Sequence, residues 1–273
     1  KYKQIVKGQE TIESSLHHSL PEHLNSEIVL KTICNTEDAI AWVKSTFFYV
    51  RLVQNPTNYK LEGLTNPGDS SLHEWVRSIL VDMRNHNLIS MNENDEIFIS
   101  KLGKTLCVHR TNFATMKLFT QMDPACDFFD TMKTLSHSKE FSQIVLRRSE
   151  KRILNEFNKN PELVRFSVGK LVRDASDKIC VLIQVFLSIQ KVEDWALRNE
   201  VMSVFSCSNR ILRCMIACLR ERKASKALVN AVRLAQCIEA HLWYDSDHVC
   251  RQLDGIGSTY STNLVIGNIR TFS

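Results

Sequence analysis

The most restrictive feature of the sequence is a nearly unbroken apolar segment, DKICVLIQVFLSIQ, at residues 177–190. A helix that is apolar on every side needs other helices around it rather than water along one face. The longest apolar run within it, residues 179–189, is too short and too polar to cross a bilayer. The segment therefore predicts the central helix of a bundle.

The composition agrees with a mainly α fold. The 273 residues include only eight Gly and five Pro, and 44% are hydrophobic and 24% charged. These proportions are typical of a folded, helix-rich chain. After a boundary at residues 121–127, the pattern predicts an amphipathic helix at 141–157 and another helix at 226–243. We therefore expect a helical bundle over residues 127–248.

Residues 26–121 have the element order of a winged-helix domain. The sequence predicts three helices, then two short apolar strands around the polar turn NEND within residues 88–100, and a further helix at 101–121. The predicted caps are Asn25 or Ser26 for the first helix, Thr36 for a second helix that continues to Pro56, and Ser70 or Ser71 for the third. Residues 1–25 remain as a polar lead-in, which we interpret as a linker.

Two short motifs resemble parts of nucleotide sites but lack what such sites need. The GKT at residues 103–105 has Phe98 where a phosphate-binding loop needs a glycine. The DEIF at residues 95–98 resembles magnesium-binding acids but falls in the predicted hairpin. We expect no cofactor site and no ATP hydrolysis from these 273 residues alone.

The nine cysteines include no C-x-x-C pair, which favours free thiols in a reducing compartment. Cys237, His241, His248 and Cys250 have the spacing C-x3-H-x6-H-x-C. This spacing matches no common zinc finger, so we expect no metal site. Ser, His and acidic residues form no catalytic triad pattern, and we predict no catalytic residue in this chain.

The basic character of the chain is concentrated in residues 207–233. This stretch has a net charge of +6, whereas the whole chain has +5. With about 100° of rotation per residue, a helix places Arg210, Arg213 and Arg220 on one face with Asn209. Ala217 lies between these arginines, and the cysteines of CSNRILRCMIACLRER (207–222) fall on the shoulder of the apolar face.

This arginine-rich face has two interpretations. One is an ordinary solvated surface. The other is an interface for a nucleic acid backbone, because arginine pairs phosphate in a bidentate way and stacks on bases. Almost no acids alternate with the arginines, which favours the second interpretation.

The tail, residues 249–273, predicts a helix–hairpin–helix. The stretch QLDGIGSTYSTNL at 252–264 has Gly255, Ile256 and Gly257 in the hairpin position. Two glycines permit a tight turn and leave backbone N–H groups at the start of the next helix, where they can bind a phosphate. The alternative is a glycine-rich loop between two helices.

Several quoted stretches resemble one family. AWVKSTFFYVRLVQNPTNY (41–59) and ESSLHHSLPEHLNSEIVLKTI (13–33) resemble the winged-helix region of Ski-like superfamily 2 helicases. FSQIVLRRSEKRILNEFNKNP (141–161) and LWYDSDHVCRQLDGIG (242–257) are most similar to the meiotic DNA helicases that promote crossover formation. The resemblance covers essentially the whole chain.

The resemblance implies an accessory region of an ATP-dependent 3′ to 5′ DNA helicase that acts on meiotic recombination intermediates in the nucleus. ATP and Mg would bind to motor domains before residue 1, joined through residues 1–25. The long basic helix would be a ratchet that tracks single-stranded or branched DNA, with recombination proteins as possible partners. Some relatives have a stacking Trp where this chain has Cys214.

Two alternatives remain open. In the spliceosomal branch of the family a similar cassette belongs to an RNA unwindase or serves mainly as a protein-docking platform. A component of a membrane translocon that shares the bundle fold is disfavoured, because the sequence shows no membrane segment.

Overall fold

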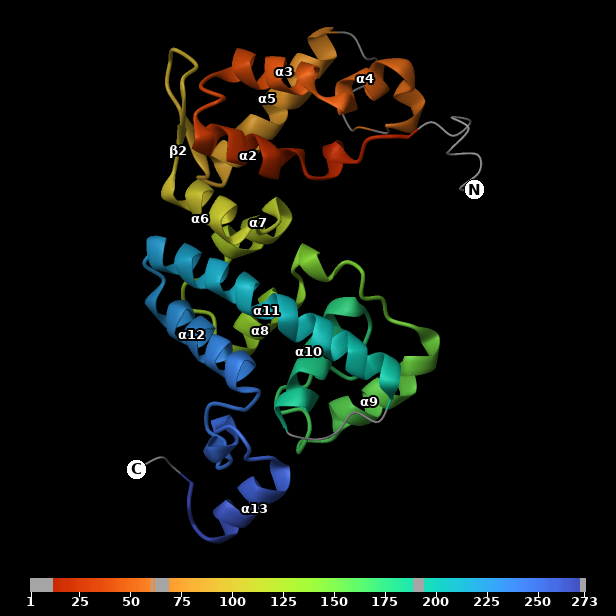
Figure 1. The fold of residues 1–273 in the computed structure, drawn as a ribbon, viewed down its shortest axis with the longest axis vertical. Helices are drawn as coiled ribbons and strands as arrows, with labels where there is room; N and C mark the ends of the chain where they lie inside the picture. Colours follow the sequence, from red (N-terminus) through yellow and green to blue (C-terminus); the bar gives the residue numbers. More distant parts are fainter. Residues whose placement is uncertain (1–11, 60, 62–68, 189–193, 271–273) are drawn as a thin grey trace. The chain divides into compact units, whose positions relative to one another are not determined.

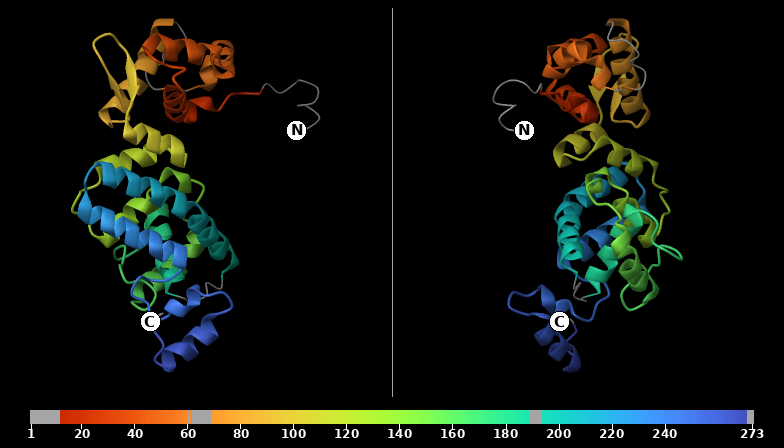
Figure 2. Two further views of the ribbon diagram at one scale, coloured as in Figure 1. Left: turned by 60° about the vertical axis from the view of Figure 1, so that its left-hand side comes forward. Right: turned by 90° about the vertical axis from the view of Figure 1, so that its right-hand side faces the viewer.

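The computed structural model describes residues 12–59, 61, 69–188 and 194–270. The chain divides into two compact units, Lys1–Phe113 and Ala114–Ser273, and each is described by itself (Figures 1 and 2). In the described ranges the fold is mainly helical with one two-stranded antiparallel hairpin, as predicted.

The first unit is a winged helix. Its elements are η1 (Leu16–His18), α2 (Leu20–Leu30), α3 (Thr36–Ser45), α4 (Phe47–Gln54), η2 (Pro56–Asn58), α5 (Asp69–Asn85), β1 (Ile89–Met91), β2 (Ile97–Ile99) and α6 (Lys101–His109). The strands pair Ile89 with Ile99 and Met91 with Ile97. Leu72, Val76 and Leu80 of α5 are buried and form the apolar face of this helix.

Four helix boundaries in this unit differ from the prediction. Asn25 does not cap the first helix, because α2 begins at Leu20 and Asn25 is buried inside it. Its Nδ2 donates a hydrogen bond of 2.8 Å to the carbonyl oxygen of Gly103. The helix predicted up to Pro56 is two helices, because Thr46 is extended and accepts a hydrogen bond from the amide of Tyr49.

The other two differences have local causes. Asn35, rather than Thr36, caps α3 by accepting from the amide of Asp38. The helix predicted at 101–121 is interrupted at Arg110, whose left-handed φ of 48° ends α6 before α7 (Phe113–Gln121) begins. The division between the two units therefore falls earlier than the predicted boundary at 121–127.

Both nucleotide-like motifs have structural roles. The Asp95 carboxylate accepts hydrogen bonds from the amide and the hydroxyl of Thr36, at 3.0 and 2.8 Å, and so ties the hairpin turn to the start of α3. Gly103 is buried in α6, where an added Cβ would run into the Ile99 side chain and the carbonyl oxygen of Leu88. The glycine is there for close packing.

Replacing Gly103 by alanine should therefore destabilise the winged helix by about 3 kcal/mol, because the added carbon overlaps a backbone oxygen that cannot move away cheaply. Chemical denaturation measures the change. Gly257→Ala is the matched control, since its added Cβ would meet nothing within 4 Å and its φ is −81°. Equal stability of the two variants would contradict the packing role of Gly103.

A carboxylate anchors the segment before α2 to the same unit. Glu13 accepts hydrogen bonds from Arg51 at 2.7 and 3.1 Å, from Asn55 at 2.9 Å and from Tyr59 at 2.8 Å. These donors, Arg51 first, lower the pKa of Glu13 to about 2. The end of the predicted linker is thus fixed on α4 and η2.

The second unit is a helical bundle. After α7 it contains α8 (Phe128–Ser136), η3 (Lys139–Phe141), η4 (Arg148–Glu150), α9 (Lys151–Lys159), α10 (Ala175–Leu187), α11 (Trp195–Glu221), α12 (Ser225–Ala240), η5 (Val249–Gln252) and α13 (Ser258–Ile266). Every residue from Lys178 to Val185 in α10 is buried, which confirms the predicted central helix. Figure 1 shows α12 alongside α11, and α10 and α8 behind α11.

The amphipathic helix predicted at 141–157 is shorter than expected. Only Lys151–Lys159 is α-helical, and it ends before Asn160 and Pro161. The reason is long-range: the carbonyl oxygen of Val145 accepts a hydrogen bond of 2.9 Å from Lys178 Nζ, so it is not used inside a helix.

Lys178 is the centre of a buried charge cluster. Its ammonium group has no solvent exposure and lies 2.6 Å from Glu150 Oε2 and 2.6 Å from Glu200 Oε2. Arg147 contacts the same two carboxylates at 2.6 and 3.0 Å. The cluster joins the 145–150 segment, α10 and α11.

Candidate nucleic-acid interface

The predicted basic segment lies on α11 and the start of α12. α11 has 27 residues, so it is about 40 Å long. It begins after Asp194, whose side chain accepts a hydrogen bond from the amide of Leu197. By length and mean hydropathy this helix could cross a membrane, but half of its most apolar window is buried inside the bundle, as in a core helix.

The face of α11 that looks away from the bundle contains the predicted arginines. Arg213 and Arg220 are exposed, whereas Arg210 and Asn209 are half-buried. The only acids of α11 are Glu200, which pairs with Lys178, and Glu221 at its last position. We call the side chains at 209, 210, 213, 217 and 220 the arginine face.

The exposed face extends further back than the sequence analysis recognised. Trp195 is 75% exposed and Met202 is 51% exposed. They lie fourteen and seven residues before Asn209, close to whole numbers of helical turns, so they share its side of the helix. The same helical periodicity is present in the sequence before residue 207, where the predicted basic face begins.

Asn209 is occupied by a contact within the bundle. Its Nδ2 donates a hydrogen bond of 2.6 Å to Glu239 Oε2 on α12. A carboxylate therefore lies beside the arginine face, although none is present on the face itself. No local pattern signals this pairing, because the two residues are thirty positions apart.

Removing this carboxylate should strengthen the binding of a polyanion. Glu239→Gln eliminates a repulsive charge and keeps a hydrogen-bond acceptor for Asn209, so we expect about two- to threefold tighter binding of single-stranded DNA at low salt. Fluorescence anisotropy measures the affinity. Glu156→Gln, an exposed acid on α9, is the control for the change in net charge. Identical affinities of the two variants would contradict a strand path beside Glu239.

Arg222 has a structural role instead of a binding one. Its guanidinium donates hydrogen bonds of 2.8 Å to the carbonyl oxygens of Phe119 and Met122 at the end of α7. These carbonyl groups lie where α7 ends and its intrahelical donors run out. The exposed basic residues that follow it are Lys223, Lys226 and Arg233.

Of the three cysteines of α11, Cys207 is half-buried, as expected for the shoulder of the apolar face, but the other two are in the core. Cys214 and Cys218 have no solvent exposure, and Cys214 Sγ lies 3.9 Å from the sulfur of Met116. Burial raises the pKa of the Cys218 thiol to about 12. All nine cysteines are free thiols, and Cys34 is exposed. Position 214 faces the core, so it offers no place for a stacking ring in this chain.

The tail is only partly a helix–hairpin–helix. Its first helix is the four-residue 3-10 turn η5, and its second is α13. Gly255 has a φ of 84°, which requires glycine, and Gly257 begins α13 without a side-chain cap. Ile256 between them is half-buried. Phosphate binding by these three residues stays a prediction.

The four residues with metal-like spacing do not form a metal centre. Cys237 is buried, and His241 packs edge-on against Phe186 and Phe205. His248 Nδ1 lies 3.0 Å from the hydroxyl of Ser261. In the described ranges no three His, Cys or acidic side chains are close enough to hold an ion.

Comparison with known proteins identifies two families that match this chain. The chain matches the family described as the Sec63 Brl domain over residues 99–268, and the winged helix-turn-helix domain family over residues 13–93. It is 34% identical to the probable ATP-dependent DNA helicase HFM1 of Xenopus tropicalis, over the whole chain and 21% of that protein. It is 28% identical to the ATP-dependent DNA helicase MER3 of Saccharomyces cerevisiae, over 94% of the chain and 23% of the relative.

A more distant match is the U5 small nuclear ribonucleoprotein 200 kDa helicase of Homo sapiens, 27% identical over 89% of the chain and 12% of that protein. The chain spans about a fifth of the length of the first curated relatives that it matches. The two matched families follow each other along the chain, a winged helix and then the Brl bundle, and the helicase relatives match across both. The chain belongs to the Sec63 Brl domain family, in the form found in HFM1- and MER3-like helicases.

Proposed function

We propose that this chain is the DNA-binding accessory region of an ATP-dependent 3′ to 5′ DNA helicase that acts on meiotic recombination intermediates during crossover formation. The strand is single-stranded or branched DNA, and it runs along the arginine face. ATP and Mg bind to motor domains of the same polypeptide, and the protein works in the nucleus, where recombination proteins are its further partners.

One observation carries the proposal. Arg213 and Arg220 are exposed on α11, seven residues apart, with no acidic residue between them. Seven residues are two helical turns, so the two guanidinium groups follow each other along one line. Small polar side chains at Asn199, Ser203 and Ser206 continue this line toward Trp195, which leaves room for a strand to approach the helix.

The test is the salt dependence of binding. We expect the logarithm of the affinity for a labelled single strand to fall with the logarithm of salt concentration with a slope of about −2 or steeper, because about three arginines would neutralise phosphates. Competition with an RNA strand of the same sequence separates a DNA from an RNA ligand. A binding curve that does not respond to salt would contradict the proposal.

A second candidate function is protein docking. Phe47, Val50 and Val53 of α4 are 54%, 47% and 50% exposed and lie at three-residue spacing on one face. Adjacent exposed apolar side chains are typical of contact surfaces. Recovery of a protein partner that is lost on Val50→Asp, together with salt-independent behaviour toward nucleic acid, would favour docking.

A further inference from the structure

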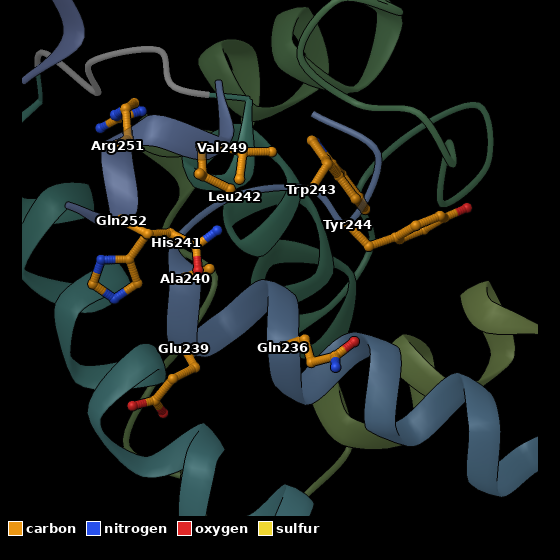
Figure 3. Close-up of a pocket in the computed structure, with 10 residues that line it drawn as sticks. All are labelled: Gln236, Glu239, Ala240, His241, Leu242, Trp243, Tyr244, Val249, Arg251 and Gln252. Carbon is orange, nitrogen blue, oxygen red and sulfur yellow. The ribbon is translucent and has the colours of Figure 1, made fainter. Parts of the chain in front are cut away.

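An open pocket of about 680 Å³ lies where α12 ends and η5 begins, within the second unit (Figure 3). Its volume falls in the range of small-molecule sites. Arg251, His241 and Gln252 lie toward one side of the pocket, and Trp243 and Tyr244 toward the other. None of these residues has a part in the arginine face.

The pocket is continuous with α11. Glu239, one of its lining residues, is hydrogen-bonded to Asn209 of the arginine face at 2.6 Å. The His241 ring packs edge-on against Phe205 of α11 with 5.4 Å between ring centroids. A strand that follows the arginine face toward Asn209 therefore reaches the mouth of this pocket.

The lining offers groups for both halves of a nucleotide. Arg251 makes no ion pair in the part of the chain that the structure describes, and its Nη1 is shielded from water without a hydrogen-bond partner. A shielded N–H group without an acceptor costs about 1–3 kcal/mol, so an anion that supplies the acceptor is favoured.

The opposite side of the pocket is aromatic. The Tyr244 ring is 53% exposed, and the Arg233 guanidinium lies 5.6 Å from its centroid. Base–aromatic stacking contributes about 1–3 kcal/mol per base in single-strand complexes. Gln236 and Gln252 add amide groups that can hydrogen-bond to the edge of a base.

We propose that this pocket holds one nucleotide of the strand bound along α11, with its phosphate at Arg251 and its base against Tyr244. The inference rests on the proposed function, because it takes the strand as given. The pocket is a second contact site, separate from the arginine face and from the turn at residues 255–257.

The pKa of His241 reports on the charge inside the pocket and can be measured in the unaltered protein. Burial lowers the pKa of His241, Glu239 raises it and Arg251 lowers it further. A phosphate near Arg251 supplies a negative charge, so the pKa of His241 should rise by roughly 1 when the strand is bound. NMR of the 273-residue chain with ¹³C-labelled histidine, with and without a saturating thymidine oligonucleotide, measures this change; His241→Gln assigns the signal.

The affinity arm uses Arg251→Gln and its matched control Arg152→Gln on α9, which is 92% exposed. We expect Arg251→Gln to lose about tenfold in affinity for the oligonucleotide at low salt and the control to lose little. Thermal unfolding verifies that both variants fold, and the NMR arm measures the unaltered protein, with His241→Gln used only to assign the signal.

The outcomes separate the two proposals. If the oligonucleotide binds with steep salt dependence while the pKa of His241 stays constant and Arg251→Gln binds as well as its control, the pocket inference is wrong and the proposed function stands. If no oligonucleotide binds to the unaltered chain, both fail. If His241 responds to a poly-glutamate peptide and not to the oligonucleotide, the pocket takes an acidic protein segment and the inference is overturned.

Discussion

Replacing Arg213 and Arg220 together by alanine should weaken the binding of single-stranded DNA about 100-fold at low salt. Each exposed guanidinium is expected to make one charge-assisted contact with a phosphate, which contributes about 1.5 kcal/mol, and 1.4 kcal/mol corresponds to a factor of ten. The slope of affinity against salt should become shallower by about 1.4, since each phosphate contact on a single strand contributes about 0.7. Fluorescence anisotropy over a salt series measures both quantities.

The matched control is Arg148→Ala together with Arg152→Ala. Both residues are exposed in the same unit and their removal changes the net charge equally. If the strand follows the arginine face, the control should lose only a few-fold in affinity, because it changes only the overall electrostatic potential of the protein. Equal losses in the two double variants would show that binding depends on net charge and that α11 is no specific path.

Replacing Lys178 by methionine should destabilise the bundle by about 3–5 kcal/mol. The ammonium group is fully buried and lies 2.6 Å from each of two carboxylates, so its removal leaves Glu150 and Glu200 with the partly exposed Arg147 as their remaining cationic partner. The carbonyl oxygen of Val145 loses its donor as well. Urea denaturation followed by circular dichroism measures the loss.

A compensated variant separates buried charge from lost packing. Combining Lys178→Met with Glu150→Gln and Glu200→Gln removes all three charges, and we expect it to recover at least half of the lost stability. Lys159→Met, an exposed lysine at the end of α9, should change stability by less than about 0.5 kcal/mol. No recovery in the compensated variant would show that the cluster acts through packing alone.

The parts of the fold that depend on local pattern could be predicted from the sequence. The nearly unbroken apolar stretch at 177–190 predicted a central helix, and the NEND turn between apolar strands predicted a hairpin wing. The helix boundaries were missed where a distant group decides them. Lys178 takes the carbonyl of Val145, and Asn25 reaches across to Gly103, and neither pairing has a signal in the local sequence.

The candidate site divides in the same way. Helical periodicity was enough to place Arg213 and Arg220 together on an exposed face, because that depends on one helix alone. It could not show that Arg222 holds α7, nor that Cys214 and Cys218 are covered by neighbouring helices. These assignments depend on which elements pack together, and single-helix geometry contains no information about that.

The eleven buried side chains along α11 have a thermodynamic consequence. They hold the helix in one conformation before any strand arrives. The protein backbone therefore does not become ordered on binding. The conformational entropy lost on association belongs to the strand and to a few arginine side chains. Calorimetry should therefore show a small heat-capacity change, unlike the large negative value of a segment that folds when it binds.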